Sequence, residues 1–214
     1  MVQQIQSVLE GIYGVSLPVR AKDFIINEQT LGILIERKLV DASFARRRGA
    51  LLVYTEDDTI NISLYLQEQL HALLERKSAK WVKLEDLCTV FEEVSHFFHL
   101  IYFWERQRQT TQLELELLGE IDKFLLSFLL LAPAINEEKI RLLRHKLFGQ
   151  FAPIEGLSSQ QWQRYYHSYR LAAKYCSHLE RQFLKRSRLD SLFQEIRQFH
   201  RLPCSEKMSL IARF

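Results

Sequence analysis

Two long apolar segments near the middle of the sequence constrain the fold more than any other feature. Residues 84–109 and 111–131 each place Leu, Ile, Val and Phe at helical spacing over about 20 residues or more. The polar string RQRQTTQ lies between them. Because a polar break of this kind lets the chain reverse direction, we expect the two segments to form an antiparallel αα-hairpin. The centre of the sequence therefore predicts a mainly α protein.

The rest of the chain fits a helical bundle with little strand. Gly 7 and Pro 4 are few for 214 residues, and 47% hydrophobic content is enough for a packed core. Asn27, Asn136 and Ser158 or Ser159 stand where a helix N-cap is expected. The predicted helices cover residues 2–12, 27–37, about 67–77, 136–149, 158–186 and 189–200, with a short last turn after Pro203.

One segment near the N-terminus changes to the period of a strand. Apolar and polar residues alternate in residues 51–55 and 59–66 around the acidic turn EDD, which predicts one small β-hairpin. Its face bearing Ile60, Ile62 and Leu64 is expected to pack on helices, since two strands alone are marginally stable. We expect one helical domain spanning residues 1–214, with a sub-division into 1–78 and 79–214 left open.

Targeting and cysteine patterns favour a cytoplasmic protein. The N-terminus has no basic region followed by an apolar run, and the apolar run after Phe124 is shorter than the ~20 residues that a spanning helix needs. Cys88, Cys176 and Cys204 form no CxxC pair, so neither a disulfide framework nor a structural zinc site is expected. We expect no membrane span and a reducing compartment.

Charge divides the chain into two unequal parts. Residues 1–138 carry 14 Lys+Arg and 21 Asp+Glu, whereas residues 139–214 carry 15 Lys+Arg and 5 Asp+Glu. Such asymmetry indicates either that the basic part binds an external polyanion or that the two parts complement each other within the fold.

One face of the longest predicted helix carries most of the positive charge in its segment. Residues three or four positions apart project from the same side of a helix, and a series of basic residues and histidines has this spacing. We name this series the basic stripe, and its members are candidate binding residues: Arg164, His167, Arg170, Lys174, His178, Arg181, Lys185 and Arg188.

The opposite face of the same helix is apolar or aromatic, and it predicts the buried side: Trp162, Tyr165, Tyr169, Ala172, Cys176, Leu179 and Phe183. Tyr166 and Tyr175 lie between the two faces, where they could stack on bases or belong to the edge of the core. Two alternatives to an external partner stay open. The basic stripe could be an ordinary solvated face, or it could dock on the acidic helix that carries Glu114, Glu116 and Glu120.

The central hairpin carries ionisable groups among apolar residues. Glu93 and His96 share one face of the first helix, and Glu116 and Glu120 share one face of the second. A turn near residues 109 and 110 would place His99 opposite Glu120 and His96 opposite Lys123. Burying a charged group in apolar surroundings costs free energy unless the group is paired. Glu93, His96, Glu116 and Glu120 are therefore either part of a structural network or candidate catalytic residues.

No metal or cofactor is expected. Helix bundles with two metal ions use Glu-x-x-His pairs, and two such strings occur, from Glu68 to His71 and from Glu93 to His96. Both precede the single glutamates instead of alternating with them, which is the wrong order for such a site. The sequence has no Gly-rich phosphate loop, no G-x-S-x-G and no H-E-x-x-H motif, and Pro203 separates Cys204 from His200.

Two functions remain. The favoured one is a non-enzymatic helical adaptor that binds an acidic protein surface or a nucleic acid through the basic stripe. The alternative is an enzyme that uses Glu93, His96, Glu116 and Glu120 for acid/base or metal chemistry. An enzyme requires a solvent-reachable pocket at these four residues, whereas an adaptor requires them closed off and the basic stripe exposed. The sequence leaves the partner and the oligomeric state open.

Overall fold

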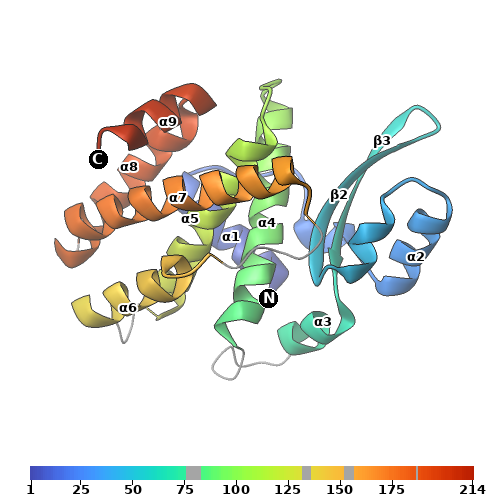
Figure 1. Ribbon diagram of the computed structural model, residues 1–214, viewed down its shortest axis with the longest axis horizontal. Coiled ribbons are helices and arrows are strands. Elements are labelled where there is room, and N and C mark those ends of the chain that lie inside the picture. Colours follow the sequence, from blue (N-terminus) through green and yellow to red (C-terminus); the bar gives the residue numbers. More distant parts are fainter. Residues whose placement is uncertain (76–82, 132–135, 152–156, 187) are drawn as a thin grey trace.

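The computed structural model describes residues 1–75, 83–131, 136–151, 157–186 and 188–214, and it is mainly helical (Figure 1). At its centre α4 (Leu84–Glu105) packs against α5 (Gln112–Leu131), so the predicted αα-hairpin is confirmed. The chain leaves α4 through Gln107, whose φ of 51° is in the left-handed region, and the Arg108 amide donates to the Phe103 carbonyl. This turn ends α4 before the polar string is finished.

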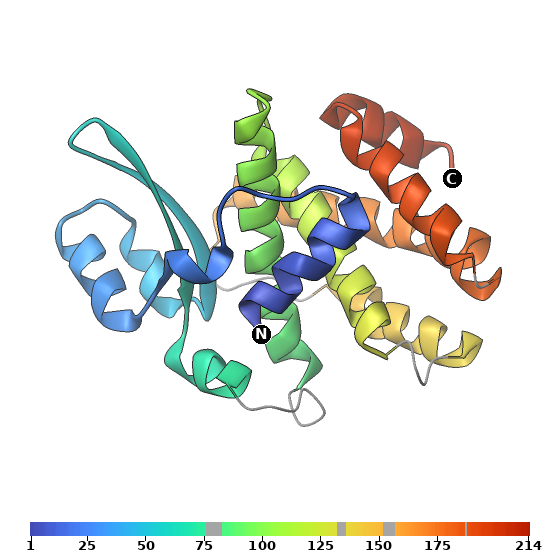
Figure 2. The same ribbon diagram turned by 180° about the vertical axis from the view of Figure 1, so that it is seen from behind.

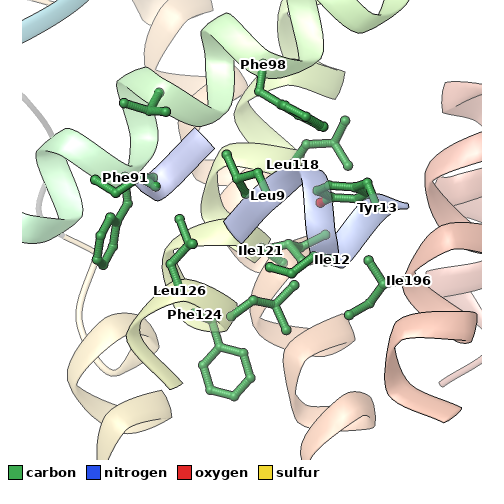
Figure 3. Close-up of a cluster of buried hydrophobic side chains, with 14 of the residues drawn as sticks. Leu9, Ile12, Tyr13, Phe91, Phe98, Leu118, Ile121, Phe124, Leu126 and Ile196 are labelled. Carbon is green, nitrogen blue, oxygen red and sulfur yellow. The ribbon is translucent and has the colours of Figure 1, made fainter. Parts of the chain in front are cut away.

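Two helices lie against the central hairpin. The long α7 (Ser159–Gln182) crosses it on one side (Figure 1), and α1 (Val2–Tyr13) lies on the other side (Figure 2). Buried apolar side chains from α1, α4, α5 and α8 pack together in one cluster of the core (Figure 3). The remaining C-terminal elements are α6 (Glu137–Phe148), the 3-10 turn η5 (Leu184–Arg186), α8 (Leu189–Arg201) and α9 (Cys204–Ala212).

The end of α1 is completed by a residue of α8. Gly14 terminates the helix with φ of 66°, a conformation that favours glycine. The Arg197 guanidinium lies against it, and Nε donates to the Ile12 carbonyl at 2.9 Å while Nη2 donates to the Gly11 carbonyl at 2.8 Å. Two carbonyls that the helix itself leaves unpaired thus receive charged donors from far along the chain.

The predicted helix starts are confirmed by their caps. The Asn27 side chain accepts from the Thr30 amide at the start of α2 (Glu28–Glu36), and the Asn136 side chain accepts from the Lys139 amide at the start of α6. Ser158 and Gln161 form a reciprocal capping box at the start of α7. These signals are local in sequence, which explains why they could be read correctly.

The C-terminal segment differs from the prediction. Instead of a short last turn, the nine-residue helix α9 follows Pro203 directly. Proline is compatible with a helix start because the first amides need no partner within the helix. Lys207 and Ile211 are buried on the inner face of α9. A lysine at a buried position does not contribute to an apolar pattern, so the helix was not predicted.

The predicted β-hairpin is present within a larger sheet. Strand β2 (Gly49–Glu56) pairs antiparallel with β3 (Thr59–Leu66), and Asp57 and Asp58 turn between them with positive φ. The two-residue strand β1 (Ile25–Ile26) pairs parallel with β3, so the sheet has the order β1-β3-β2. A strand this short has no readable alternation, which is why a hairpin alone was predicted.

The expected packing of the hairpin is partly wrong. Leu64 is fully buried and Ile62 is half-buried against the core, but Ile60 is 52% exposed. The reason is visible in Figure 1, where the tip of the hairpin extends away from the helices. Alternation predicted the face correctly and could not predict where the helices stop covering it.

The main core includes residues from both predicted sub-divisions, for example Leu9, Leu64 and Phe98, and a smaller cluster around Leu34 and Leu52 lies between α2 and the sheet. The proposed boundary at residues 78 and 79 lies outside the described residues. Within the described ranges, no helix is long and apolar enough to cross a membrane. The other short elements are η1 (Ala21–Phe24), η2 (Ala42–Arg46) and α3 (Glu68–Glu75).

Candidate functional site

A pocket of about 740 Å³, named here the site pocket, lies where four parts of the chain meet. The end of η2 and the start of β2 form one wall, α4 and α5 form the floor, and the first turns of α7 form the other wall. Three of the four candidate catalytic residues line it, namely Glu93, His96 and Glu116. The solvent-reachable pocket that an enzyme would require is therefore present at this part of the cluster.

His96 lies between two carboxylates in the floor of the site pocket. Its Nδ1 is 3.9 Å from Glu93 Oε2, and its Nε2 is 3.7 Å from Glu116 Oε2. Both distances exceed that of a hydrogen bond, and the buried Nε2 has no hydrogen-bond partner in the part of the chain that the structure describes. A Cβ on Gly119 would lie 2.8 Å from this Nε2, so the absence of a side chain on α5 makes room for the imidazole.

Lys123 organises the carboxylates next to this group. Its Nζ donates to Glu92 Oε2 at 2.9 Å and to Glu120 Oε1 at 2.8 Å. Glu120 lines a second pocket of about 820 Å³ beside the site pocket, and Glu92 lines both. Glu120, the fourth candidate catalytic residue, is thus separated from Glu93, His96 and Glu116. Glu92, which was not among the predicted candidates, lies with these three in the site pocket.

Burial gives the groups in the site pocket different protonation states. Burial and then the charge of Glu92 raise the pKa of Glu116 to about 8, and the same causes raise the pKa of Glu93 well above its usual value. Burial lowers the pKa of His96 to about 4. Although burial opposes ionisation of Glu92, Lys123 holds the pKa of Glu92 below its usual value. At neutral pH the His96 imidazole is therefore uncharged, and burial favours the protonated form of Glu116.

Arginines surround the carboxylates. Arg164 Nε is 4.0 Å from Glu116 Oε1, and this buried nitrogen also has no hydrogen-bond partner. Arg48 forms an ion pair with Asp86, and the Arg47 guanidinium lies over the Phe44 ring. Arg46 is exposed at the same wall. The run of three arginines before β2 is visible in the sequence, but only the fold brings it to the α4–α5 hairpin.

The basic stripe is interrupted by contacts within the chain. Arg164 turns into the site pocket, the Lys174 Nζ donates to the Ala212 carbonyl at 2.8 Å, and the His178 ring stacks on Phe214 with centroids 3.7 Å apart. Lys185 Nζ lies 3.7 Å from Glu180 Oε1. The members that are exposed and form no ion pair in the described ranges are His167, Arg170, Arg181 and Arg188. The Arg170 guanidinium lies over the Tyr166 ring, 5.8 Å from its centre. The end of α9 thus covers the middle of the stripe.

The opposite face of α7 is buried over part of its length. Ala172, Cys176 and Leu179 are fully buried, whereas Trp162 is 39% exposed. Tyr175 was expected between the two faces, but it is fully buried and stacks on Phe199 with centroids 4.1 Å apart. It is therefore not placed to stack on bases.

Among the described residues, the only ion pair between the stripe and the acidic helix joins Arg164 and Glu116. Glu114 binds Lys207 and Arg108 instead, and Glu120 binds Lys123. The second Glu-x-x-His string, Glu68 and His71 on α3, lines neither the site pocket nor its neighbour. The two strings are therefore not brought together at either pocket.

A fully buried polar group lies deeper in the core and is named here the Asp122 network. Asp122 accepts hydrogen bonds from Tyr13 at 2.5 Å, from Ser95 at 2.6 Å and from His99 Nε2 at 2.8 Å. His99 Nδ1 is 3.1 Å from His200 Nε2. The predicted pairing of His99 with Glu120 is thus wrong, and that of His96 with Lys123 gives way to the pairing of Lys123 with Glu92. The network connects α1, α4, α5 and α8.

A second buried group closes the C-terminal helices onto the hairpin. The Lys207 Nζ donates to Glu114 Oε1 and to the His200 carbonyl, each at 2.8 Å, and also to the Leu202 carbonyl. Arg108 donates to the same Glu114 oxygen at 2.6 Å and to the Leu202 carbonyl at 2.9 Å. Lys207 and Glu114 are fully buried and Arg108 is partly exposed, and together they hold the turn before α9 in place.

Comparison with family models, with curated protein sequences and with solved structures finds no significant match to this chain. The function of the chain is therefore inferred from the geometry of the site pocket.

Proposed function

We propose that the protein binds a small anionic molecule in the site pocket, and that the adjoining Glu/His group acts on this molecule by proton transfer or through a metal ion. One observation carries the proposal. Two buried nitrogens, His96 Nε2 and Arg164 Nε, flank the Glu116 carboxylate in one pocket, and neither has a hydrogen-bond partner among the described residues.

Unpaired buried polar atoms are expensive, at about 1–3 kcal/mol each, so a folded protein retains them where a ligand or water completes them. Two such atoms on the wall and floor of one pocket support a ligand that reaches both. The guanidinium of Arg164 presents planar paired donors, which match the oxygens of a phosphate or a carboxylate. Arg46 and Arg47 add positive charge to the same pocket.

The test is binding of compact anions to the purified full-length chain in buffer that contains a chelator. Pyrophosphate, citrate and a panel of phosphate- and carboxylate-bearing metabolites are compared by thermal shift, followed by calorimetric titration. We expect at least one anion to bind, and Arg164→Gln to weaken that binding by about tenfold or more, since this corresponds to about 1.4 kcal/mol for a charged hydrogen bond.

Arg170→Gln is the matched control, because Arg170 lies on the same helix but is exposed and lines neither pocket. It should bind the anion as the unaltered protein does. Failure of every anion to bind, or equal weakening by the two substitutions, would remove the proposal.

We propose as a second candidate that the exposed part of the basic stripe binds a polyanion, either an acidic protein surface or a nucleic acid. The supporting observation is that Arg170, Arg181 and Arg188 are exposed, and none of the three forms an ion pair in the described ranges. Reversing all three to Glu is expected to abolish binding without unfolding the protein, because these side chains do not belong to the core.

The two kinds of polyanion are separated by salt. Three or four phosphate contacts to duplex DNA predict a slope of about −3 to −4 for the logarithm of affinity against the logarithm of salt concentration. A protein partner predicts a gentler dependence and a discrete stoichiometry. A large fall in melting temperature after the triple reversal, with no polyanion bound by the unaltered chain, would assign the stripe to the fold alone.

A further inference from the structure

Three residues in the floor of the site pocket share the chemistry and the spacing of metal ligands. Glu92, His96 and Glu116 each offer one ligand atom, and these atoms all lie within 4.8 Å of one another. A bound transition metal at about 2.0–2.2 Å from each ligand would require separations of about 3–4 Å, so small side-chain movements suffice. The three come from adjacent turns of α4 and from the facing part of α5.

The surroundings of His96 also favour a metal site. Its Nδ1 faces Glu93, and its buried Nε2 has no protein partner. Histidines that bind metals with one ring nitrogen commonly direct the other to a carboxylate, which fixes the orientation of the ring. Gly119 makes room for this end of the imidazole, because a Cβ there would lie 2.8 Å from Nε2.

The remaining contacts are compatible with a cation. Lys123 Nζ donates to one oxygen of Glu92 and leaves the other oxygen free to bind. Hydrogen bonds of this kind to a ligating carboxylate are usual around metal sites. Arg164 lies 4.0 Å from Glu116 on the outer side, where it could hold an anion against the ion.

We propose that Glu92, His96 and Glu116 bind one divalent transition-metal ion, of the class of Mn²⁺, Fe²⁺ or Zn²⁺, with positions left open toward the site pocket. One imidazole with two carboxylates suits these ions better than Ca²⁺ or Mg²⁺, which take oxygen ligands, or Cu(I), which takes sulfur. The inference rests on the proposed function only in that the small anion would fill an open coordination position. It departs from the sequence-based expectation that no metal binds.

The experiment uses the full-length protein freed of metal by a chelator and then dialysed against Mn²⁺ or Zn²⁺. Metal analysis is expected to find one ion per chain. Co²⁺ should bind at the same position and give visible absorption bands that report its coordination. Both His96→Ala and Glu116→Gln are expected to weaken binding by at least about tenfold, since each removes a ligand.

His71→Ala is the matched control, because His71 belongs to the other Glu-x-x-His string and lines neither pocket. It should leave stoichiometry and affinity unchanged. If His96→Ala does not fold, as judged by circular dichroism, Gly119→Ala supplies the second test. It keeps all three ligands and displaces the imidazole, so it should also weaken binding.

The proposal is overturned if the unaltered chain binds no stoichiometric ion, if His71→Ala weakens binding as much as His96→Ala does, or if Gly119→Ala and Glu116→Gln leave the affinity unchanged. Anion binding is measured with a chelator present and is tested with Arg164→Gln, whereas metal binding is tested with variants of His96, Glu116 and Gly119. One proposal can therefore fail while the other holds. A chain that binds anions and no metal would retain the proposed function and lose this inference.

Discussion

Replacing Asp122 with alanine is expected to lower the free energy of unfolding by about 3–5 kcal/mol, the range for breaking a buried ion-paired network. The side chain is fully buried and accepts three hydrogen bonds, from Tyr13, Ser95 and His99. Truncation would leave all three donors without an acceptor in the core. The change should be measured by urea denaturation at pH 7, with the slope of the transition compared between variants.

Two substitutions bracket this prediction. Tyr13→Phe removes one donor and leaves Asp122 with two, so a smaller loss of about 1–2 kcal/mol is expected. Asp190→Ala alters an exposed carboxylate at the start of α8 and should change stability by about 0.5 kcal/mol or less. An Asp122→Ala variant as stable as Asp190→Ala would show that water or a rearranged core satisfies the three donors.

Replacing Lys207 with alanine is expected to cost about 3–5 kcal/mol as well, for a related reason. Lys207 is fully buried, and its ammonium group binds the Glu114 carboxylate and the carbonyls of His200 and Leu202. Its removal leaves a cavity beside Phe103 and Phe199 and deprives three acceptors of a donor. The measurement is again the free energy of unfolding by urea.

The comparison with Lys207→Met separates packing from charge. Methionine restores most of the volume, and Arg108 continues to donate to Glu114 and to the Leu202 carbonyl. We therefore expect Lys207→Met to cost about half as much as Lys207→Ala. If the two variants lose the same stability, the loss comes from the missing hydrogen bonds of the ammonium group to Glu114 and to the two carbonyls. The cavity then contributes little.

The sequence predicted those parts of the fold that depend on near neighbours. Apolar residues at helical spacing predicted α4 and α5, and the caps at Asn27, Asn136 and Ser158 are complete within a few residues of the chain. The β-hairpin followed from alternation in the same way. Strand β1 was missed because two residues carry no period, and it exists through its pairing with β3.

The candidate site was predicted less completely because it depends on helix register and on distant segments. A turn placed symmetrically at residues 109 and 110 paired His99 with Glu120, but α4 ends at Glu105 and α5 begins at Gln112. The true offset brings Asp122 to His99. Glu93, His96 and Glu116 were nevertheless selected, since ionisable groups in apolar helices are conspicuous. Glu92 and the arginines before β2 were not.

The basic stripe shows a different limit. Spacing predicted correctly that its residues share one side of a helix, but it could not predict that α9 would fold back over part of that side. Lys174 and His178 contact the end of α9 through Ala212 and Phe214. A pattern on one helix does not reveal which other helix covers it.

The contacts of Arg197 with α1 have a consequence for how the chain is made. Helix α1 is completed by a residue 185 positions later, so its last carbonyls lack this donor until Arg197 has been synthesised. The apolar face of α1, including Leu9, likewise packs against helices that appear much later. Closing so long a loop is slow, and an unfinished apolar helix is prone to aggregate. The packing of α1 can therefore be completed only after α8 has been synthesised, and until then the apolar face of α1 lacks part of its cover.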